Sequence, residues 1–276
     1  MEQVEEHRCG AEHRQHTDPA GAACALEAAQ RGFAQCHRRR MQQASLDGVR
    51  VHDIGRTLDT FEPKAIGIDI LFDQPQDEDA ELLETLRTMQ TPVGVAYANL
   101  ATNRDDIVYE QQQYLEAFQA ELAGSKSRPA SIRLDNTFGA TRVWPGLVEG
   151  LPPLLGRALL ADAGQSAPAF RAYEGAIDYR RPKFVDSPLF AALQIDLFAD
   201  PDPAVLPFLA EQIEGKYVLI GGDIVDYDRV ETTFTSINGE VPAGIAVHAE
   251  IIAQMLDDRV LTPIPEWVIW GMAVLA

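Results

Sequence analysis

Five aspartates and one histidine are the side chains of this sequence best suited to binding chemistry. Asp223, Asp226 and Asp228 crowd one short stretch, while Asp69 and Asp73 stand in and just after an apolar run. Carboxylate oxygens are preferred by hard cations such as Mg²⁺ and Ca²⁺, so the three clustered aspartates form a candidate metal site. The stretch does not follow the EF-hand pattern. The sequence therefore allows a cation there without requiring any cofactor.

The remaining candidates each allow a binding role and a structural one. Asp69 either holds a ligand or metal or accepts hydrogen bonds from a neighbouring loop, because a buried carboxylate must be paired, hydrogen-bonded or neutral. Asp73 is better placed for a ligand, with simple solvent exposure as its alternative. Gly221 and Gly222 allow either close approach of an anion or a tight turn. His248 is either a proton-sensitive ligand contact or a structural histidine.

These residues fall at the ends of predicted strands and at the start of a predicted helix. The run 65–72, AIGIDILF, has the continuous apolar character of a buried parallel strand. A helix is expected after it, because Asp77, Glu78 and Asp79 suit a helix N-terminus. Further elements are predicted in chain order: a strand in 91–100, a helix in 111–124, a short strand and turn at 177–182, helices at 190–195 and 207–213, a strand at 216–222 and a helix in 241–258.

Strands alternating with helices predict an α/β fold, with a mostly parallel sheet flanked by helices. The single domain is expected to cover residues 53–262. In open α/β sheets ligands bind outside the carboxyl ends of the strands. Because Asp73 directly follows residues 65–72 and two glycines end residues 216–222, we expect the candidate residues to gather at that edge.

Charge and cysteine content set the first 52 residues apart. Residues 1–52 are net neutral and hold all three cysteines, whereas the rest of the chain carries the whole formal charge of −19. Residues 26–46 show a weak helical stripe, so this region is predicted to be an arm with one amphipathic helix. A nucleic-acid partner is excluded by the acidity, because phosphate binding needs clustered basic residues.

The last residues, 263–276, have the character of a helix that enters a membrane. After Glu266 the chain is uncharged, and Trp267 and Trp270 stand where an interfacial aromatic belt is expected. About 20 apolar residues are needed to cross a bilayer, so this segment corresponds to the first half of a span. A C-terminal core helix is the alternative, although such a helix normally shows a polar face.

Several spaced motifs together resemble one known family. These are IGIDILF with QDEDAEL, then IDYRRP, then KYVLIGG followed by Asp228, Thr232 and Thr233, then PAGIAVHAEIIAQML, VLTPIPEW and the apolar end. The order is similar to that of the CHASE domain of the second type, the cyclase- and histidine-kinase-associated sensory extracellular domains. The resemblance covers about residues 53–276.

The resemblance implies a sensor and not an enzyme. It implies a domain on the periplasmic side of a bacterial cell membrane, held by its C-terminal segment and coupled to an adenylate or guanylate cyclase or a kinase. It adds Thr232 to the candidate ligand-binding residues. The implied partners are an unknown small ligand or ion and a second copy of the chain.

Two other functions stay open from the residues alone. A metal-dependent hydrolase would use the loop of Asp223, Asp226 and Asp228 together with His248. Neither a G-x-S-x-G nucleophile elbow nor a P-loop supports an enzyme. A dimerising spacer above the membrane is the third possibility.

Overall fold

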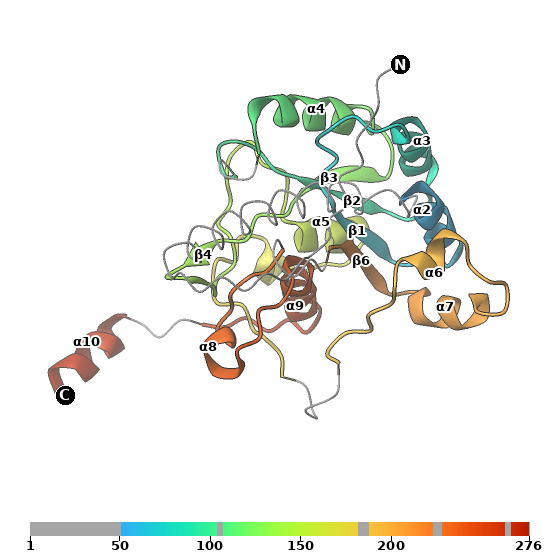
Figure 1. Ribbon diagram of the computed structural model, residues 1–276. Coiled ribbons are helices and arrows are strands. Elements are labelled where there is room, and N and C mark those ends of the chain that lie inside the picture. The colour runs from blue at the N-terminus through green and yellow to red at the C-terminus, as the bar shows by residue number, and fades with distance from the viewer. Residues whose placement is uncertain (1–50, 104–106, 182–187, 223–227, 263–265, 276) are drawn as a thin grey trace, which may run out of the picture. The chain divides into compact units, whose positions relative to one another are not determined.

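The domain is built on a four-stranded parallel sheet. The computed structural model describes residues 51–103, 107–181, 188–222, 228–262 and 266–275. The strands are β1 (Ala65–Asp69), β2 (Val93–Tyr97), β3 (Ser127–Ser131) and β6 (Tyr217–Gly221), in the order β3-β2-β1-β6. All three pairings are parallel, which confirms the predicted α/β fold with a mostly parallel sheet flanked by helices (Figure 1).

Two helices pack on one face of this sheet. Helix α5 (Leu155–Asp162) contacts β1, β2 and β3, and α9 (Gly244–Leu256) contacts β6 and α5. The close approach of α5 depends on glycine, because a Cβ at Gly67 or Gly94 would lie 2.9 Å from a methyl group of Leu159 or Leu155. Helix α5 therefore packs directly on the backbone of the central strands β1 and β2.

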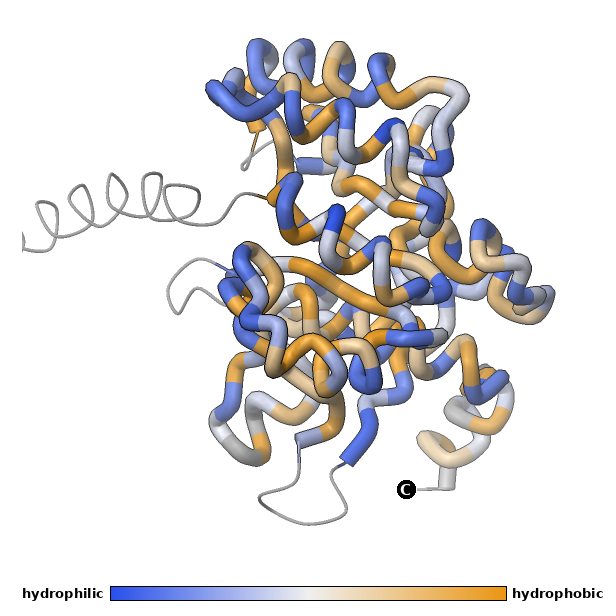
Figure 2. Tube along the Cα trace, turned by 90° about the vertical axis from the view of Figure 1, so that its right-hand side faces the viewer, coloured by the Kyte–Doolittle hydropathy of each residue, from blue (hydrophilic) through white to orange (hydrophobic). Residues whose placement is uncertain are grey.

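The other helices lie earlier in the chain or on its periphery. They are α2 (Val51–Thr60), α3 (Asp79–Thr88), α4 (Tyr109–Ala120), α6 (Asp196–Ala199), α7 (Leu206–Ile213) and α8 (Thr235–Asn238). Helix α2 packs on α3 and α6. The buried Gln119 of α4 donates to the carbonyl oxygen of Ala96 in β2, and Phe118 stacks on Phe72 at 5.1 Å. In Figure 2 hydrophobic and hydrophilic residues alternate around the turns of the helices at the top.

A cluster of three aromatic side chains packs against α5 and α9. Trp144, Phe170 and Tyr173 form it, with ring centroids 5.2–5.4 Å apart. It packs with buried residues of both helices, among them Leu155 and Ile251. Strands β4 (Asn136–Thr137) and β5 (Ala140–Thr141) form a small antiparallel pair before it, and η1 (Pro168–Phe170) is a single 3₁₀ turn.

Three sequence expectations differ from the structure. Strand β1 ends at Asp69 and not at residue 72, because the chain turns away after the last pairing with β6. Residues 177–181 form no strand in the described part, and only Ala176 bridges to Val143. The helix expected at 190–195 is wrong, since helix α6 begins at Asp196. The predicted helix at 26–46 lies outside the described residues, and the domain boundaries at 52 and 262 stay predictions.

The C-terminal segment contains helix α10 (Glu266–Leu275). Its Trp267 and Trp270 side chains are 76% and 70% exposed. Across the described ranges no helix combines the length and the apolar character that crossing a membrane demands. That this segment opens a longer span therefore stays a prediction.

Candidate functional site at the switch point of the sheet

The strand order creates one special position at the carboxyl edge of the sheet. From β1 the chain adds β2 and β3 on one side, and it later returns to add β6 on the other side of β1. In doubly wound sheets such a switch point opens a crevice outside the strand ends, where ligands bind. Here β1 and β6 end side by side, with Asp69 paired to Gly221.

Asp69 lies at this position, and the pKa of its carboxyl group is raised. Burial disfavours its charged form and raises its pKa from 3.8 to about 6. Within the described ranges no donor forms a hydrogen bond to its side chain. Its oxygens are therefore available to a ligand as far as the described residues show, and both roles predicted for Asp69, ligand binding and acceptance of loop N–H groups, stay predictions.

Asp228 is the second carboxyl of the switch point. Its pKa is raised to about 6, first by burial and then by the charge of Asp69, while His248 acts in the opposite direction. Its main-chain oxygen accepts from the N–H of Gly244, at the first residue of α9, over 3.0 Å. A Cβ on Gly244 would lie 3.0 Å from Asp228 Oδ1, so this glycine lets the carboxyl approach the helix.

His248 faces the same group from the second turn of α9. Its side chain is buried, and its Nε2 lies 3.2 Å from the carbonyl oxygen of Ile132. Burial lowers its pKa to about 4, so the ring is neutral at neutral pH. Because a carbonyl oxygen only accepts, Nε2 carries the proton and Nδ1 is a bare acceptor. No donor reaches this buried Nδ1 from the part of the chain that the structure describes.

The other predicted ligand-binding residues have structural partners. Asp73 accepts from Gln111 Nε2 of α4 at 2.5 Å. Thr232 is buried, and its Oγ1 accepts from the N–H of Phe234 at 3.3 Å. A Cβ added at Gly221 would lie 3.0 Å from the side chain of Ile245. Helix packing thus accounts for this glycine without an anion.

The predicted metal loop is only partly described. Asp223 and Asp226 lie outside the described residues. Among the residues that the structure does describe, no group of three or more histidine, cysteine, aspartate or glutamate side chains could hold a metal ion. The metal assignment to Asp223, Asp226 and Asp228 therefore stays a prediction.

A polar network on α9 is the feature that sequence reasoning missed. Gln254 is buried and makes four hydrogen bonds: Oε1 accepts from Trp144 Nε1 at 2.9 Å and from the N–H of Asp178 at 3.1 Å. Its Nε2 donates to the carbonyl oxygens of Ala176 at 3.2 Å and Arg259 at 2.9 Å. The signal that could have found it is the pair of polar residues, 250 and 254, one turn apart in an apolar helix.

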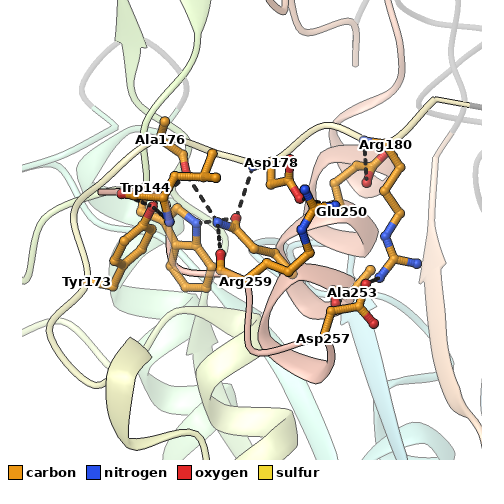
Figure 3. A network of polar contacts seen from close by, with 11 residues as sticks. Trp144, Tyr173, Ala176, Asp178, Arg180, Glu250, Ala253, Asp257 and Arg259 are labelled. Atoms are coloured by element: carbon orange, nitrogen blue, oxygen red, sulfur yellow. Dashed lines mark hydrogen bonds and ion pairs between the residues drawn. The ribbon is translucent and has the colours of Figure 1, made fainter. Parts of the chain in front are cut away.

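The same network fixes the segment that leaves α9, residues 259–262, here called the exit segment. The Tyr173 hydroxyl donates to Ala176 O at 2.9 Å and accepts from the N–H of Leu261 at 3.2 Å. Arg259 forms an ion pair with Asp178 at 2.7 Å. Figure 3 shows these side chains gathered beside the C-terminal half of α9. The exit segment is therefore tied to the helix and to the Trp144 cluster at once.

Charged groups hold the adjoining turn of α9. Arg180 Nη2 donates to Ala253 O at 2.8 Å and pairs with Asp257 at 2.6 Å. The Glu250 carboxyl accepts from the N–H of Arg180 at 3.3 Å. Burial raises the pKa of Glu250 to about 7, with Arg180 lowering it and Asp178 raising it (Figure 3). This carboxyl is thus poised to gain or lose a proton near neutral pH.

Comparison with known proteins identifies the family. A family model of the CHASE2 domain matches residues 35–276, which is most of the chain. The chain belongs to the CHASE2 domain family. CHASE2 domains are non-catalytic sensory domains, so the resemblance noted in the sequence is confirmed and the chain is a sensory domain. No curated protein gave a significant match, and no solved structure did.

Proposed function

We propose that this CHASE2 domain is the extracytoplasmic sensor of a bacterial membrane receptor, with an adenylate or guanylate cyclase or a kinase as its output. Membership in a family of extracytoplasmic receptor domains supports the location. The uncharged C-terminal segment, from Trp267 onward, supports attachment to the membrane. A second copy of the chain is the proposed partner, because receptors that feed such outputs signal as dimers.

The observation that carries the proposal is that one helix joins the candidate site to the exit segment. Helix α9 presents His248 to the switch point and, six residues later, Gln254 to the exit segment. These positions are separated by about 9 Å of continuous helix. A helix transmits displacement as a rigid element, so a ligand that moves the first turns also moves the exit segment.

The proposed ligand of the switch point is a small molecule or ion with donor or cationic character. The bare Nδ1 of His248 offers a buried acceptor, and Asp69 and Asp228 add two carboxyls. An unsatisfied buried acceptor costs about 1–3 kcal/mol, which a donor on the ligand would recover. Asp73, Gly221, Gly222 and Thr232 also stay in the predicted ligand-binding set.

The proposed output domain is tested by sequencing the coding frame downstream of Ala276. We expect it to continue through apolar spans into a cyclase or kinase domain. A stop codon directly after Ala276 would contradict the receptor assignment, because the remaining apolar segment is too short to cross a bilayer.

The test of location is the labelling of a single cysteine in intact cells. Cys9, Cys24 and Cys36 are replaced by serine, and Glu149→Cys places a thiol at an exposed position. A membrane-impermeant maleimide is expected to label this thiol in intact cells as fully as after lysis. Labelling only after lysis would place the domain inside the cytoplasm and refute the proposal.

A further inference from the structure

A large pocket lies apart from the switch point. Its volume is about 930 Å³, and its walls come from β3, from residues 145–154, from α5 and from residues 164–171. Prolines and aliphatic side chains such as Leu151 and Leu160 make up much of the wall, together with the aromatic Phe170. Pockets of about 300–1,000 Å³ with mostly apolar walls and a few polar groups are typical of small-molecule sites.

The charge of this pocket is opposite to that of the protein. Four arginines line it, namely Arg128, Arg133, Arg157 and Arg171, and Asp162 is the one acidic residue in the lining. The chain as a whole carries a formal charge of −19. Asp162, Asp135 and Glu174 lie beside Arg128, Arg133 and Arg157, so four guanidinium ions face three carboxylates. The excess positive charge of this group attracts an anion.

Two of the arginines have unused donors. Arg133 donates through Nη2 to Asp135 at 2.8 Å and to the Gly146 carbonyl oxygen at 3.1 Å, but its buried Nε lacks a partner in the described ranges. The side chain of Arg171 is exposed and makes no hydrogen bond or ion pair to any residue that the structure describes. Leaving a buried donor unpaired costs about 1–3 kcal/mol, so a bound acceptor at Arg133 would be stabilising.

The other two arginines frame the pocket. Arg128 lies 3.7 Å from Asp162 with its side chain 66% exposed, a loose pair that contributes little. Arg157 is held in place, since Nε donates to Phe170 O at 3.0 Å and Nη2 donates to Tyr173 O at 2.6 Å. Its guanidinium also lies 5.3 Å from the Trp144 ring centroid. One wall is thus preorganised, while Arg128 and Arg171 are free to adjust.

We propose that this arginine pocket binds a small organic anion that has an apolar body. The carboxylate or phosphate group is held by Arg133 together with Arg128 and Arg171, because guanidinium ions match both anions with paired donors. The apolar body lies against the proline and leucine side chains of the pocket wall. This site is separate from the switch point and does not depend on the receptor assignment.

The experiment is calorimetric titration of the full 276-residue chain with three probes of one shape. These are 1-naphthyl phosphate, 1-naphthoate and the neutral 1-naphthalenemethanol. We expect at least one anion to bind at least tenfold more tightly than the neutral probe, and to bind more weakly at 300 mM than at 50 mM KCl. The preferred anion identifies the head group as phosphate or carboxylate. Failure of both anions to bind, or equal binding of the neutral probe, would overturn the proposal.

Matched double variants decide whether the arginines are responsible. Arg128→Ala with Arg171→Ala removes two exposed charges from the pocket. Arg56→Ala with Arg142→Ala removes two exposed charges elsewhere, and Arg56 has a similar loose pair, 3.6 Å from Asp53. We expect the pocket variant to lose at least tenfold in affinity for the anion and the control to change less than twofold. Equal losses in both variants would show only a general charge effect and would refute the site.

Discussion

The change Gln254→Leu tests whether α9 holds the exit segment. Leucine has a similar volume to glutamine but forms none of the four hydrogen bonds of Gln254. The indole N–H of Trp144, whose side chain is only 1% exposed, is then left buried without its partner. That loss alone costs about 1–3 kcal/mol, and each of the other bonds contributes about 1 kcal/mol at most.

We therefore expect the free energy of unfolding to fall by about 2–4 kcal/mol. Urea denaturation followed by circular dichroism measures this change. The matched control is Gln113→Leu on α4, where the glutamine is exposed and bonds only to Glu116 at 3.3 Å. Surface changes of this kind stay within about 0.5 kcal/mol.

Amide hydrogen exchange locates the effect within the domain. The Asp178 N–H, which donates to Gln254 Oε1 in the parent, should lose protection in the variant. The Ser131 N–H, which donates to Pro153 O at 2.9 Å, should keep it. A variant within 1 kcal/mol of the parent, with Asp178 still protected, would refute the role given to Gln254.

Three further predictions address protonation and packing. The pKa of Glu250 is raised from 4.5 to about 7, so the folded state holds an extra proton between these values and its stability falls as pH rises through them. In urea denaturation, Glu250→Gln should therefore be more favourable to stability, compared with the parent, at pH 8 than at pH 4, by on the order of 2 kcal/mol. An equal effect at both pH values argues against the raised pKa. His248, with its pKa lowered to about 4, should show no titration of its ring signals by NMR between pH 8 and pH 5.5, whereas a midpoint near 6.5 would mean that the ring is not buried. Gly67→Ala brings a Cβ to 2.6 Å from a methyl group of Leu219 in β6 and to 2.9 Å from a methyl group of Leu159 in α5, and it should cost about 1–3 kcal/mol. Gly271→Ala, with nothing within 4 Å, should cost less than about 0.5 kcal/mol, and equal losses would contradict the close packing at Gly67.

The central strands and the carboxyl edge of the sheet as the place for ligands could be predicted because their signals are local. β1 and β6 are continuous apolar runs that end in polar residues or glycines, and this pattern requires only a few neighbouring positions. The rule that ligand sites lie at the carboxyl ends of parallel strands pointed to Asp73, because the strand was expected to continue to residue 72, whereas β1 ends at Asp69. The pairing of Asp69 opposite Gly221 then depended on the strand order, which the sequence did not specify.

β3 and α5 escaped prediction for separate physical reasons. β3 is a short edge strand that contains Pro129, a residue usually taken as evidence against a strand and tolerated only at an edge. Helix α5 has eight residues and follows two prolines, so its apolar run is too short to show a helical period. Both elements form walls of the arginine pocket.

The polar network around Gln254 could not be predicted because it joins distant segments. Trp144 and Gln254 are 110 positions apart, and Tyr173 and Leu261 are 88 apart. No periodicity in one sequence encodes which buried amide meets which indole. The polar residues Glu250 and Gln254 on α9 indicate only that other polar groups of the protein lie opposite them.

The two candidate sites converge on the same helix, and this gives the domain a physical route for combining signals. At the switch point α9 contributes His248; at the arginine pocket it contributes Met255 to the wall, beside the exit segment. Arg157 connects the pocket to the Trp144 ring, whose N–H is held by Gln254. A ligand shifts the equilibrium between two positions of α9 only as far as its affinities for those two positions differ. An anion in the pocket would contact the wall to which Met255 of α9 belongs, whereas a donor at His248 would act about two turns earlier in the same helix. If both ligands shift α9, each changes the affinity for the other by the same factor.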